Sequence, residues 1–347
     1  MSKSDIYIKR CLDLARIYCG YVRINPSVGA VIVNKDKVIG EGAHQQYGLA
    51  HAEVNAVKSV NDREKLPESS LFVSLEPCFH QGKTPPCVQL ILEKKIPHVE
   101  FSCEDPNPLV AGKSSQLLEE NGVDVKQGTL HRAGAELIRP FVRGMISKRP
   151  YIILKYAQTS NLKIGMQAEQ VWLTNIFSKY LVHKWRAEAD AIMVGTNTAV
   201  WDNPSLNNRL YFGKKQLLRI VVDRTLKVPP THGLLDGVEN TIVLTAEKVE
   251  NATGIEYFQS NFEGDYLQHF FEQLYIREIG VLIVEGGSAL LQSLIDQGLW
   301  DEARVFTVSK KLGNEAVAAP ILTNEKLIRK VSLKTDIIRQ YFNIMPS

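Results

Sequence analysis

The chain has 347 residues, of which 44% are hydrophobic and 23% are charged, and its formal net charge is +3. This length and composition fit about two globular domains. No stretch approaches the roughly 20 consecutive apolar residues of a membrane-spanning helix, which argues against a membrane protein. No long run of lysine and arginine indicates a nucleic-acid-binding arm.

The amino-terminal sequence "MSKSDIYIKRCLDLARIYCG" places charges among its apolar positions, so it does not look like a secretory signal. Five cysteines, an odd number, are spread along the chain. They fit reduced thiols or a metal site better than a disulfide framework. We therefore expect a cytoplasmic protein. We also expect it to bind a small molecule, neither nucleic acid nor membrane, and to form a homo-oligomer, either a dimer or a tetramer.

Strands and helices alternate through the first part of the chain. Apolar residues from Ile8 to Cys19 recur at helical spacing, and strands at 28–33 and 38–42 flank a turn. The same patterns predict helices at 51–60, 87–95 and 114–121, and strands at 71–75, 98–103 and 123–127. This alternation predicts an α/β domain with helices packed on the faces of a sheet.

A second α/β domain is predicted after the stretch "ISKRP". Its apolar strands are predicted at 151–157, 189–195, 218–223, 241–245, 281–287 and 302–308. We place the two domains at residues 1–147 and 148–347.

One histidine and two cysteines in the first domain have the chemistry of a zinc site. His51 opens the predicted helix "HAEVNAVKSV", and Cys78 and Cys87 each follow a proline in "SLEPCFHQGKTPPC". A catalytic zinc has three such protein ligands and leaves the fourth position to water. Glu53, two residues after His51, is the candidate catalytic residue that takes the proton of this water and hands it to a leaving amine.

The order His-x-Glu, then Pro-Cys, then Cys is the signature of zinc deaminases that act on nucleobases. It departs from that signature in one respect, because eight residues, and not two, separate the cysteines. The alternative is a structural zinc site, in which His80 would be the fourth ligand. That alternative gives Glu53 no role.

In the second domain, "VLIVEGGSALLQSLI" is an apolar strand that enters a Gly-Gly pair and then a helix. Glycines let backbone amides approach a phosphate closely, and a helix N-terminus adds partial positive charge. The stretch lacks the G-x-G-x-x-G pattern, and it can equally be an ordinary tight connection between a strand and a helix.

The spacing of "HQGKTPPC", together with "NPSVGAVIV", "GAHQQYGLAHAE" and "DPNPLVAGK", resembles the bifunctional riboflavin-biosynthesis deaminase/reductase of bacteria. The resemblance continues through "LKYA", "VWLT", "HKWRAEADAIMVGTNTAVWDNPSLNNRL" and "VEGGS". It implies a cytidine-deaminase-like three-layer α/β/α domain followed by a dihydrofolate-reductase-like α/β domain. It also implies two reactions: zinc-dependent hydrolytic deamination of 2,5-diamino-6-(5-phosphoribosylamino)pyrimidin-4-one, then NADPH-dependent reduction of the ribosyl group to ribityl.

The resemblance assigns site residues in both domains. In the first, it implies zinc ligation by His51, Cys78 and Cys87, proton transfer by Glu53, and a pyrimidine and phosphate pocket lined by Asn25, His44, Lys83, Asp105 and Asn107. Asparagine and histidine read donor and acceptor edges, and lysine supplies a charge for phosphate. The two asparagines precede prolines and can also be turn residues, and Lys83 can also be a solvated loop charge.

In the second domain, the resemblance implies substrate contacts by Lys155, Gln170, Arg186, Leu206, Arg209 and Glu285. It implies NADPH contacts by Ala157, Trp172, Thr198, Asp202, Gly287, Ser288, Ala289, Leu290, Leu291, Gln292 and Ser293. Two arginines suit a ribosyl phosphate because a guanidinium binds phosphate in a bidentate way. They can equally be surface residues, and Trp172 can equally belong to the core.

One stretch departs from the family. Sequences of this type read Ser-x-Asp-Gly shortly after the Lys-x-Ala strand, where this chain has "TSNL", with Asn161 in place of aspartate and Leu162 in place of glycine. We expect hydride transfer to slow more than cofactor binding weakens. Two alternatives therefore stand beside the two-step enzyme: a deaminase of another base or nucleoside with a weak or inactive reductase-like domain, and a non-catalytic zinc-stabilised binding protein.

Overall fold

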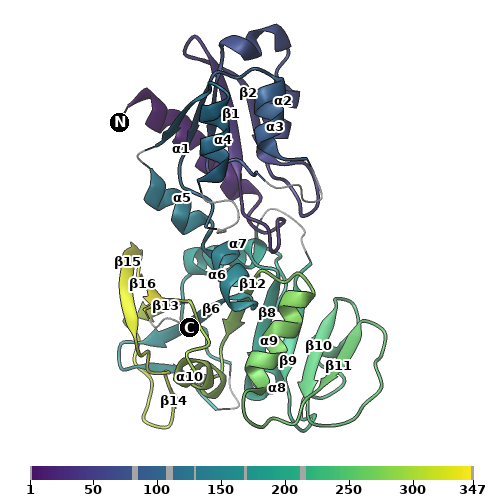
Figure 1. Cartoon of the computed structure of the whole chain (residues 1–347). Helices are drawn as coiled ribbons and strands as arrows, with labels where there is room; N and C mark the ends of the chain where they lie inside the picture. The colour runs from purple at the N-terminus through teal and green to yellow at the C-terminus, as the bar shows by residue number, and fades with distance from the viewer. Residues whose placement is uncertain are drawn as a thin grey trace. The chain divides into compact units, whose positions relative to one another are not determined.

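The computed structural model describes residues 2–79, 85–106, 112–128, 130–167, 170–211 and 216–344. Within it the chain divides into two compact units, Met1–Ile146 and Ser147–Ser347 (Figure 1). Each unit has its own sheet and its own hydrophobic core. None of the described helices is long and apolar enough to cross a bilayer.

The described residues of the first unit form a five-stranded sheet in the order β2-β1-β3-β4-β5. The strands are β1 (Gly29–Asn34), β2 (Lys37–Ala43), β3 (Ser70–Val73), β4 (His98–Phe101) and β5 (Asp124–Gln127). β1 pairs antiparallel with both β2 and β3, whereas β3, β4 and β5 are mutually parallel. Helical connections between the parallel strands place helices on the faces of the sheet.

Helices cover both faces of this sheet, so the first unit has three layers. The helices are α1 (Lys3–Ile17), α2 (Ala52–Ser59), α3 (Cys87–Glu93), α4 (Lys113–Glu120), α5 (His131–Leu137) and α6 (Arg139–Ser147). Apolar residues of α2, α3 and α4 share one core with the sheet, and those of α1 and α5 share another. Every residue of β1 is buried as a result. This arrangement confirms the predicted α/β/α architecture.

The contact between α2 and β2 requires a glycine. A Cβ atom at Gly42 would lie 2.3 Å from the backbone nitrogen of Ala56, well inside the contact distance of two heavy atoms. The absent side chain lets the helix backbone approach the strand closely. The same helix begins next to His51, which is its N-cap residue.

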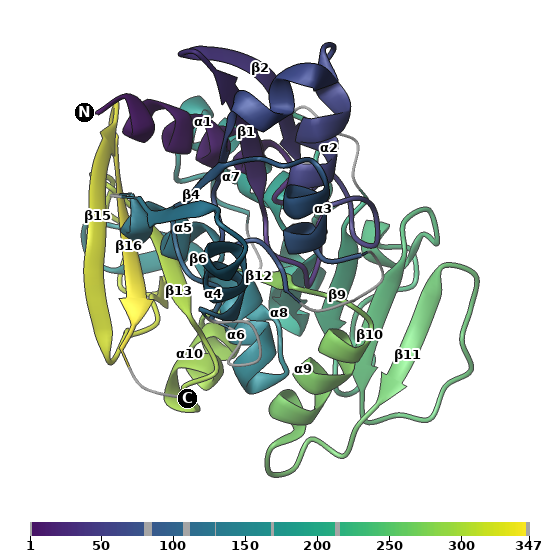
Figure 2. The same cartoon turned by 45° about the horizontal axis from the view of Figure 1, so that its top comes forward.

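The described residues of the second unit form a nine-stranded sheet in the order β11-β10-β9-β8-β12-β6-β13-β16-β15. Its strands are β6 (Tyr151–Thr159), β8 (Ala191–Gly195), β9 (Leu218–Val222), β10 (Thr241–Thr245), β11 (Ile255–Gln259), β12 (Val281–Glu285), β13 (Glu302–Val308), β15 (Glu325–Leu333) and β16 (Asp336–Asn343). The strands are parallel from β11 to β13, and β16 and β15 add antiparallel pairs at one edge (Figure 2). A two-stranded sheet joins β7 (Lys163–Gly165) to β14 (Val317–Ala318).

The helices of the second unit also lie on both faces of its sheet. They are α7 (Ile176–Glu188), α8 (Thr196–Asp202), α9 (Tyr266–Ile276) and α10 (Ser288–Asp296). Apolar residues of α9 and α10 pack in one core with the sheet, whereas α8, Trp185 of α7 and Ala189 directly after α7 contribute to another. The helices α8 and α10 each begin directly after a parallel strand, at the carboxyl edge where ligands bind in such sheets.

The strands predicted from apolar runs are all present, within a few residues at their ends. Those that the patterns did not predict are β7, β11, β14, β15 and β16. Most of the residues of these strands are partly or fully exposed, so they form no continuous apolar run. The edge strand β15 has seven exposed positions among its nine.

The turn between β6 and β7 holds the two residues at which the sequence departs from the pattern that it otherwise resembles. Leu162 has a φ of 58°, the left-handed conformation that favours glycine, and its side chain is 60% exposed. Asn161 fills a different role, because its Nδ2 donates to the carbonyl of Leu312 (2.8 Å) and its Oδ1 accepts from the Thr159 hydroxyl (2.8 Å). An aspartate has no donor for that carbonyl.

Leu162→Gly should stabilise the protein. The left-handed conformation destabilises the folded protein by about 1–2 kcal/mol when the residue is leucine. Replacing leucine by glycine removes this strain, but the greater freedom of glycine stabilises the unfolded chain and offsets about 0.5–1 kcal/mol of the gain. We expect the free energy of unfolding in urea to rise by about 0.5–1 kcal/mol. Leu162→Ala is the control, because alanine removes the side chain and keeps the strain. Equal stability of the two variants would contradict this explanation.

Candidate functional site

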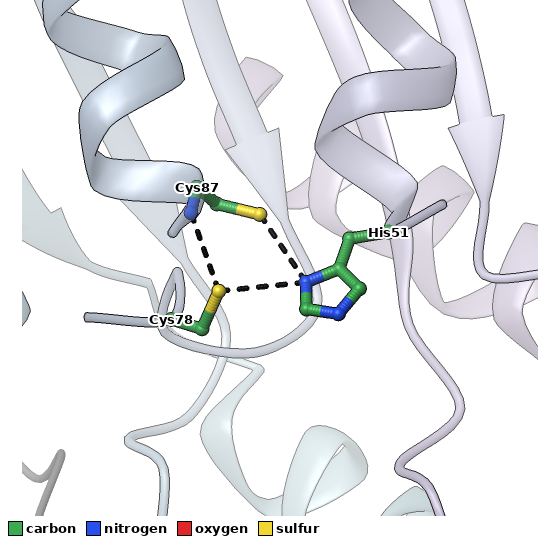
Figure 3. Close-up of side chains that lie close together, drawn as sticks. All are labelled: His51, Cys78 and Cys87. Atoms are coloured by element: carbon green, nitrogen blue, oxygen red, sulfur yellow. Dashed lines mark hydrogen bonds between the residues drawn. The ribbon is translucent and has the colours of Figure 1, made fainter. Parts of the chain in front are cut away.

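Three predicted metal ligands meet in the first unit. His51 is the N-cap residue of α2, Cys87 is the first residue of α3, and Cys78 lies in the segment after β3. The Nδ1 atom of His51 is 3.4 Å from the sulfur of Cys78 and 3.4 Å from that of Cys87 (Figure 3). Tetrahedral zinc, with Zn–S of about 2.3 Å and Zn–N of about 2.0 Å, would separate nitrogen and sulfur by about 3.5 Å. The three side chains therefore fit a zinc ion.

The first turn of α3 also favours a thiolate at Cys78. The backbone N–H of Cys87 donates to the Cys78 sulfur at 3.2 Å, and a helix N-terminus attracts negative charge. A hydrogen bond from the Cys87 side chain lowers the pKa of Cys78 to about 4, despite its burial. The same bond, together with burial, raises the pKa of Cys87. A bound metal ion takes up both cysteines as thiolates.

Glu53 lies in the first turn of α2, close to this group of ligands. Its side chain forms a hydrogen bond with Cys87, yet it does not belong to the set of three ligand atoms. Glu53 is 4% exposed, and burial, followed by the negative charge of Cys78, raises the pKa of its carboxyl. A carboxyl group with a raised pKa accepts a proton more readily than an ordinary glutamate.

Asn25 and His44 are linked to each other beside the ligands. The Nδ1 of His44 lies 3.1 Å from the carbonyl of Ala50, so this nitrogen donates and Nε2 accepts the hydrogen bond from the Asn25 amide at 3.1 Å. Burial lowers the pKa of His44, which favours this neutral ring. The ring lies edge-on to that of His51, with 5.8 Å between centroids. The structure thus brings both predicted substrate residues next to the metal ligands.

A further buried carboxylate, Glu76, was not predicted from the sequence. Its carboxylate is 2% exposed and accepts hydrogen bonds from the backbone of Asp105 (3.3 Å), the backbone of Gly112 (3.2 Å), and both the backbone and the hydroxyl of Ser115. Glu76, which lies two residues before Cys78 in the chain, therefore anchors the backbone of the predicted substrate residue Asp105 and the start of α4. Its position, as a charged residue directly after an apolar strand, was the available signal.

Three residues named from the sequence lie outside the described part of the chain. They are Lys83 and Asn107, expected in the substrate pocket, and His80, the alternative zinc ligand.

In the second unit, a buried carboxylate joins two cations at the end of β12. Glu285 and Lys155 are register partners on neighbouring parallel strands, and their charged atoms are 3.4 Å apart. Arg186, on α7, binds Glu285 through two parallel hydrogen bonds of 2.9 Å. Burial alone would raise the pKa of Glu285, but Arg186 and Lys155 lower it to about 2. The cluster therefore keeps a carboxylate and an excess of positive charge.

The segment after α8 adds a further cation to this cluster. Arg186 donates from Nη1 to the backbone carbonyl of Asn207 at 3.0 Å, and Arg209 donates from Nη1 to the side-chain oxygen of the same residue at 2.9 Å. Arg209 is exposed, whereas the side chain of Leu206 is buried in the core, with a φ of 51°. The backbone N–H of Arg209 donates to His183, another residue that sequence analysis missed.

Thr198 and the predicted cofactor residues from Gly287 to Ser293 follow the carboxyl ends of the neighbouring strands β8 and β12. Gly286 and Gly287 both have a φ of 72°, and a Cβ atom at Gly287 would lie 3.1 Å from the Thr198 hydroxyl. The side chain of Thr198 thus contacts the glycine turn that precedes α10. This helix starts at Ser288 and includes the other predicted cofactor residues of the segment, Ala289, Leu290, Leu291, Gln292 and Ser293.

The remaining predicted residues lie in different surroundings. Ala157 is partly buried on β6, and Asp202 ends α8, where burial raises the pKa of its carboxyl. Gln170 and Trp172 are exposed in the segment before α7. Trp172 is 64% exposed, and its ring contacts the ammonium group of Lys179. This exposure shows that Trp172 does not belong to the core.

Two family models match the chain. Residues 1–103 match the cytidine and deoxycytidylate deaminase zinc-binding region, and residues 150–343 match the RibD C-terminal domain. The riboflavin biosynthesis protein RibD of Bacillus amyloliquefaciens is 36% identical over 92% of this chain and 88% of its own length. The protein of the same name from Aquifex aeolicus is 37% identical over 88% of this chain and 87% of its own.

Solved structures agree over almost the whole chain. A diaminohydroxyphosphoribosylaminopyrimidine deaminase/5-amino-6-(5-phosphoribosylamino)uracil reductase from Thermotoga maritima matches with a TM-score of 0.89 and 29% identity, and covers 98% of this chain and 99% of its own. RibD from Acinetobacter baumannii matches with a TM-score of 0.86 and 28% identity, and covers 99% of both chains. The fold of both units is therefore that of these enzymes.

The purified protein should hold about one zinc ion per chain, measured by atomic emission. Cys78→Ala and Cys87→Ala should each lose most of it, because each removes one of three ligands. Cys103→Ala is the matched control: Cys103 is also a buried free cysteine of the first unit, but it lies outside the group of ligands. Retention of zinc by the first two variants, or its loss from the third, would contradict the assignment.

Proposed function

The chain belongs to the RibD family of riboflavin biosynthesis proteins, which are bifunctional deaminases and reductases, and we propose that it acts on the two substrates in the name of its Thermotoga maritima relative. The first reaction is deamination of a diaminohydroxyphosphoribosylaminopyrimidine. The second is reduction of 5-amino-6-(5-phosphoribosylamino)uracil. The observation that carries the proposal is the buried Glu53 beside three zinc-type ligands, within a chain that matches both halves of the family.

The two reactions are assigned to different halves of the chain. Residues 1–147 carry deamination and residues 148–347 carry reduction. The assignment is supported by the two family models, which match 1–103 and 150–343, and by the division of the chain into units that end and begin at Ile146 and Ser147.

In the first half, His51, Cys78 and Cys87 hold zinc. When bound, zinc lowers the pKa of a coordinated water to about 7 and so supplies the nucleophile. Glu53 takes a proton on its carboxylate and delivers it to the leaving amine. Its burial supports this role, because burial raises the pKa of a carboxyl group and so strengthens it as a proton acceptor.

Five residues are the proposed substrate contacts of the deaminase. Asn25 and His44 present amide and imidazole groups to the pyrimidine, and the neutral ring of His44 holds the Asn25 amide in a fixed orientation. The backbone of Asp105 is anchored by Glu76, which precedes the proposed ligand Cys78 by two residues. Lys83 and Asn107 complete the proposed pocket as residues inferred from the sequence alone.

In the second half, the cofactor residues lie along the carboxyl edge of the sheet. NADPH supplies the hydride for reduction. The glycine turn at Gly287 and the first turn of α10 present backbone N–H groups to a phosphate, with Thr198 close to the turn. The rest of the proposed cofactor segment, up to Ser293, continues along α10. Ala157, Trp172 and Asp202 complete the proposed cofactor site.

The cluster around Glu285 is the proposed substrate site of the reductase. Lys155, Arg186 and Arg209 together outweigh the charge of Glu285, which suits a phosphorylated ribose. Arg209 offers an exposed guanidinium for bidentate contact with phosphate. Gln170 and the backbone of Leu206 are the remaining proposed contacts.

The setting of the enzyme is also a proposal. All five cysteines are free, and two of them belong to the proposed zinc site, which fits the reducing cytoplasm. We assign no nucleic acid or membrane as partner, and we expect a homo-oligomer, a dimer or a tetramer, which light scattering on the purified protein will test.

A coupled assay tests the proposed function as a whole. The purified zinc-loaded chain is given the pyrimidine substrate with NADPH, and ammonia release and NADPH oxidation are both followed. The proposal expects both, with oxidation after deamination. Ammonia release without NADPH oxidation would support only the deaminase reaction. Bound zinc without either reaction would contradict the proposal that the chain is an enzyme.

Glu53→Gln should abolish deamination and leave the rest of the enzyme intact. Glutamine keeps the size of the side chain but cannot carry the proton, so ammonia release should fall by at least about 100-fold. Zinc content and reduction of the already deaminated substrate should match those of the unmodified enzyme. Loss of zinc with this change, or deamination that survives it, would contradict the role of Glu53 as proton carrier.

Gly287→Ala should weaken NADPH binding. The strain of a side chain at a φ of 72° lowers the stability of both the free and the bound protein, but the new Cβ would also press on Thr198 and shift the turn that faces the cofactor. We therefore expect the dissociation constant of NADPH to rise about tenfold. Gly298→Ala is the matched control, because Gly298 has a φ of 66° just beyond the other end of α10 and has open space around its Cβ position. Equal weakening by both variants would indicate general destabilisation.

A further inference from the structure

His183 is a buried histidine that contacts the segment carrying Arg209. It lies on α7 and is 2% exposed, so its ring is not available to a substrate. Its Nδ1 lies 3.3 Å from the backbone nitrogen of Arg209. A backbone N–H can only donate, so Nδ1 is the acceptor, and the proton of the neutral ring resides on Nε2.

The surroundings of His183 keep this acceptor available. Burial, followed by the positive charges of Arg186 and Arg209, lowers the pKa of His183 to about 4. The ring is therefore neutral at neutral pH. A protonated ring would carry a hydrogen on both nitrogens and would lose the contact with the Arg209 N–H.

Helix α7 holds this segment at two points. Arg186 follows His183 by three residues, on the same face of the helix, and donates to the backbone carbonyl of Asn207 at 3.0 Å. His183 accepts from the backbone of Arg209, two residues further along the segment. Because Arg186 also binds Glu285, the helix connects the backbone at Arg209 to the proposed substrate cluster.

We propose that His183 is a positioning residue for the reductase, which fixes the backbone at Arg209 so that its exposed guanidinium meets the phosphate of the substrate. The inference rests on the proposed role of Arg209 in binding that substrate. The described residues 203–211 form neither helix nor strand, so no regular hydrogen-bond ladder holds their backbone. Ordering this segment in advance removes an entropy cost that substrate binding would otherwise carry.

Two variants of similar shape separate this role from simple packing. Asparagine at position 183 keeps a side-chain acceptor near the place of Nδ1, whereas leucine keeps the volume and removes the acceptor. In steady-state reduction of 5-amino-6-(5-phosphoribosylamino)uracil by NADPH, His183→Leu should raise KM about tenfold and leave kcat almost unchanged. His183→Asn should keep KM close to that of the unmodified enzyme. NADPH affinity should be the same in all three proteins.

A double-variant cycle identifies the residue through which His183 acts. If it acts through Arg209, then His183→Leu combined with Arg209→Ala should have the KM of Arg209→Ala alone. Additive effects would overturn the inference, as would equal KM values for the leucine and asparagine variants or a parallel loss of NADPH affinity. An unmodified enzyme that does not oxidise NADPH with this substrate would refute the proposed function itself. An active enzyme with an unchanged KM in His183→Leu would overturn only the role of His183.

Discussion

Buried carboxylates impose the main constraint on this protein, because a charge removed from water must find partners within the fold. Glu53, Glu76 and Glu285 are 4%, 2% and 7% exposed. Glu76 is satisfied by backbone and hydroxyl donors, and Glu285 by an arginine and a lysine. Three of these partners, Asp105, Lys155 and Arg186, are themselves proposed substrate residues. Satisfying the buried charge therefore also fixes the geometry of the site.

Glu53 differs from the other two in the direction of its pKa. The cations beside Glu285 keep it ionised, whereas burial and the nearby thiolate favour the protonated form of Glu53. One carboxylate thus serves as a permanent charge that orients Arg186, and the other suits proton transfer. The same residue type has two functions, which are set by the charges that surround it.

The departure at the β6–β7 turn has different consequences at its two residues. Leu162 occupies the left-handed conformation for which glycine is suited, so the backbone conformation is kept at an energetic cost. Asn161 gains a hydrogen bond to the Leu312 carbonyl that an aspartate cannot make. The new asparagine thus joins the turn to a distant part of the same unit. That the turn slows hydride transfer stays a prediction, to be tested by single-turnover reduction.

The sequence alone determined the α/β class, the strands of both sheets that carry apolar patterns, and the group of three zinc-type side chains, because apolar patterns and ligand chemistry are local properties of the chain. Strands β15 and β16 were not predicted from the sequence, because their partly exposed residues form no apolar pattern. Only the tertiary structure assigned Glu76 and His183. Their partners, Asp105 and Arg209, lie 29 and 26 residues away in the chain. A buried polar side chain takes its role from the groups that packing places against it, and no local pattern encodes those groups.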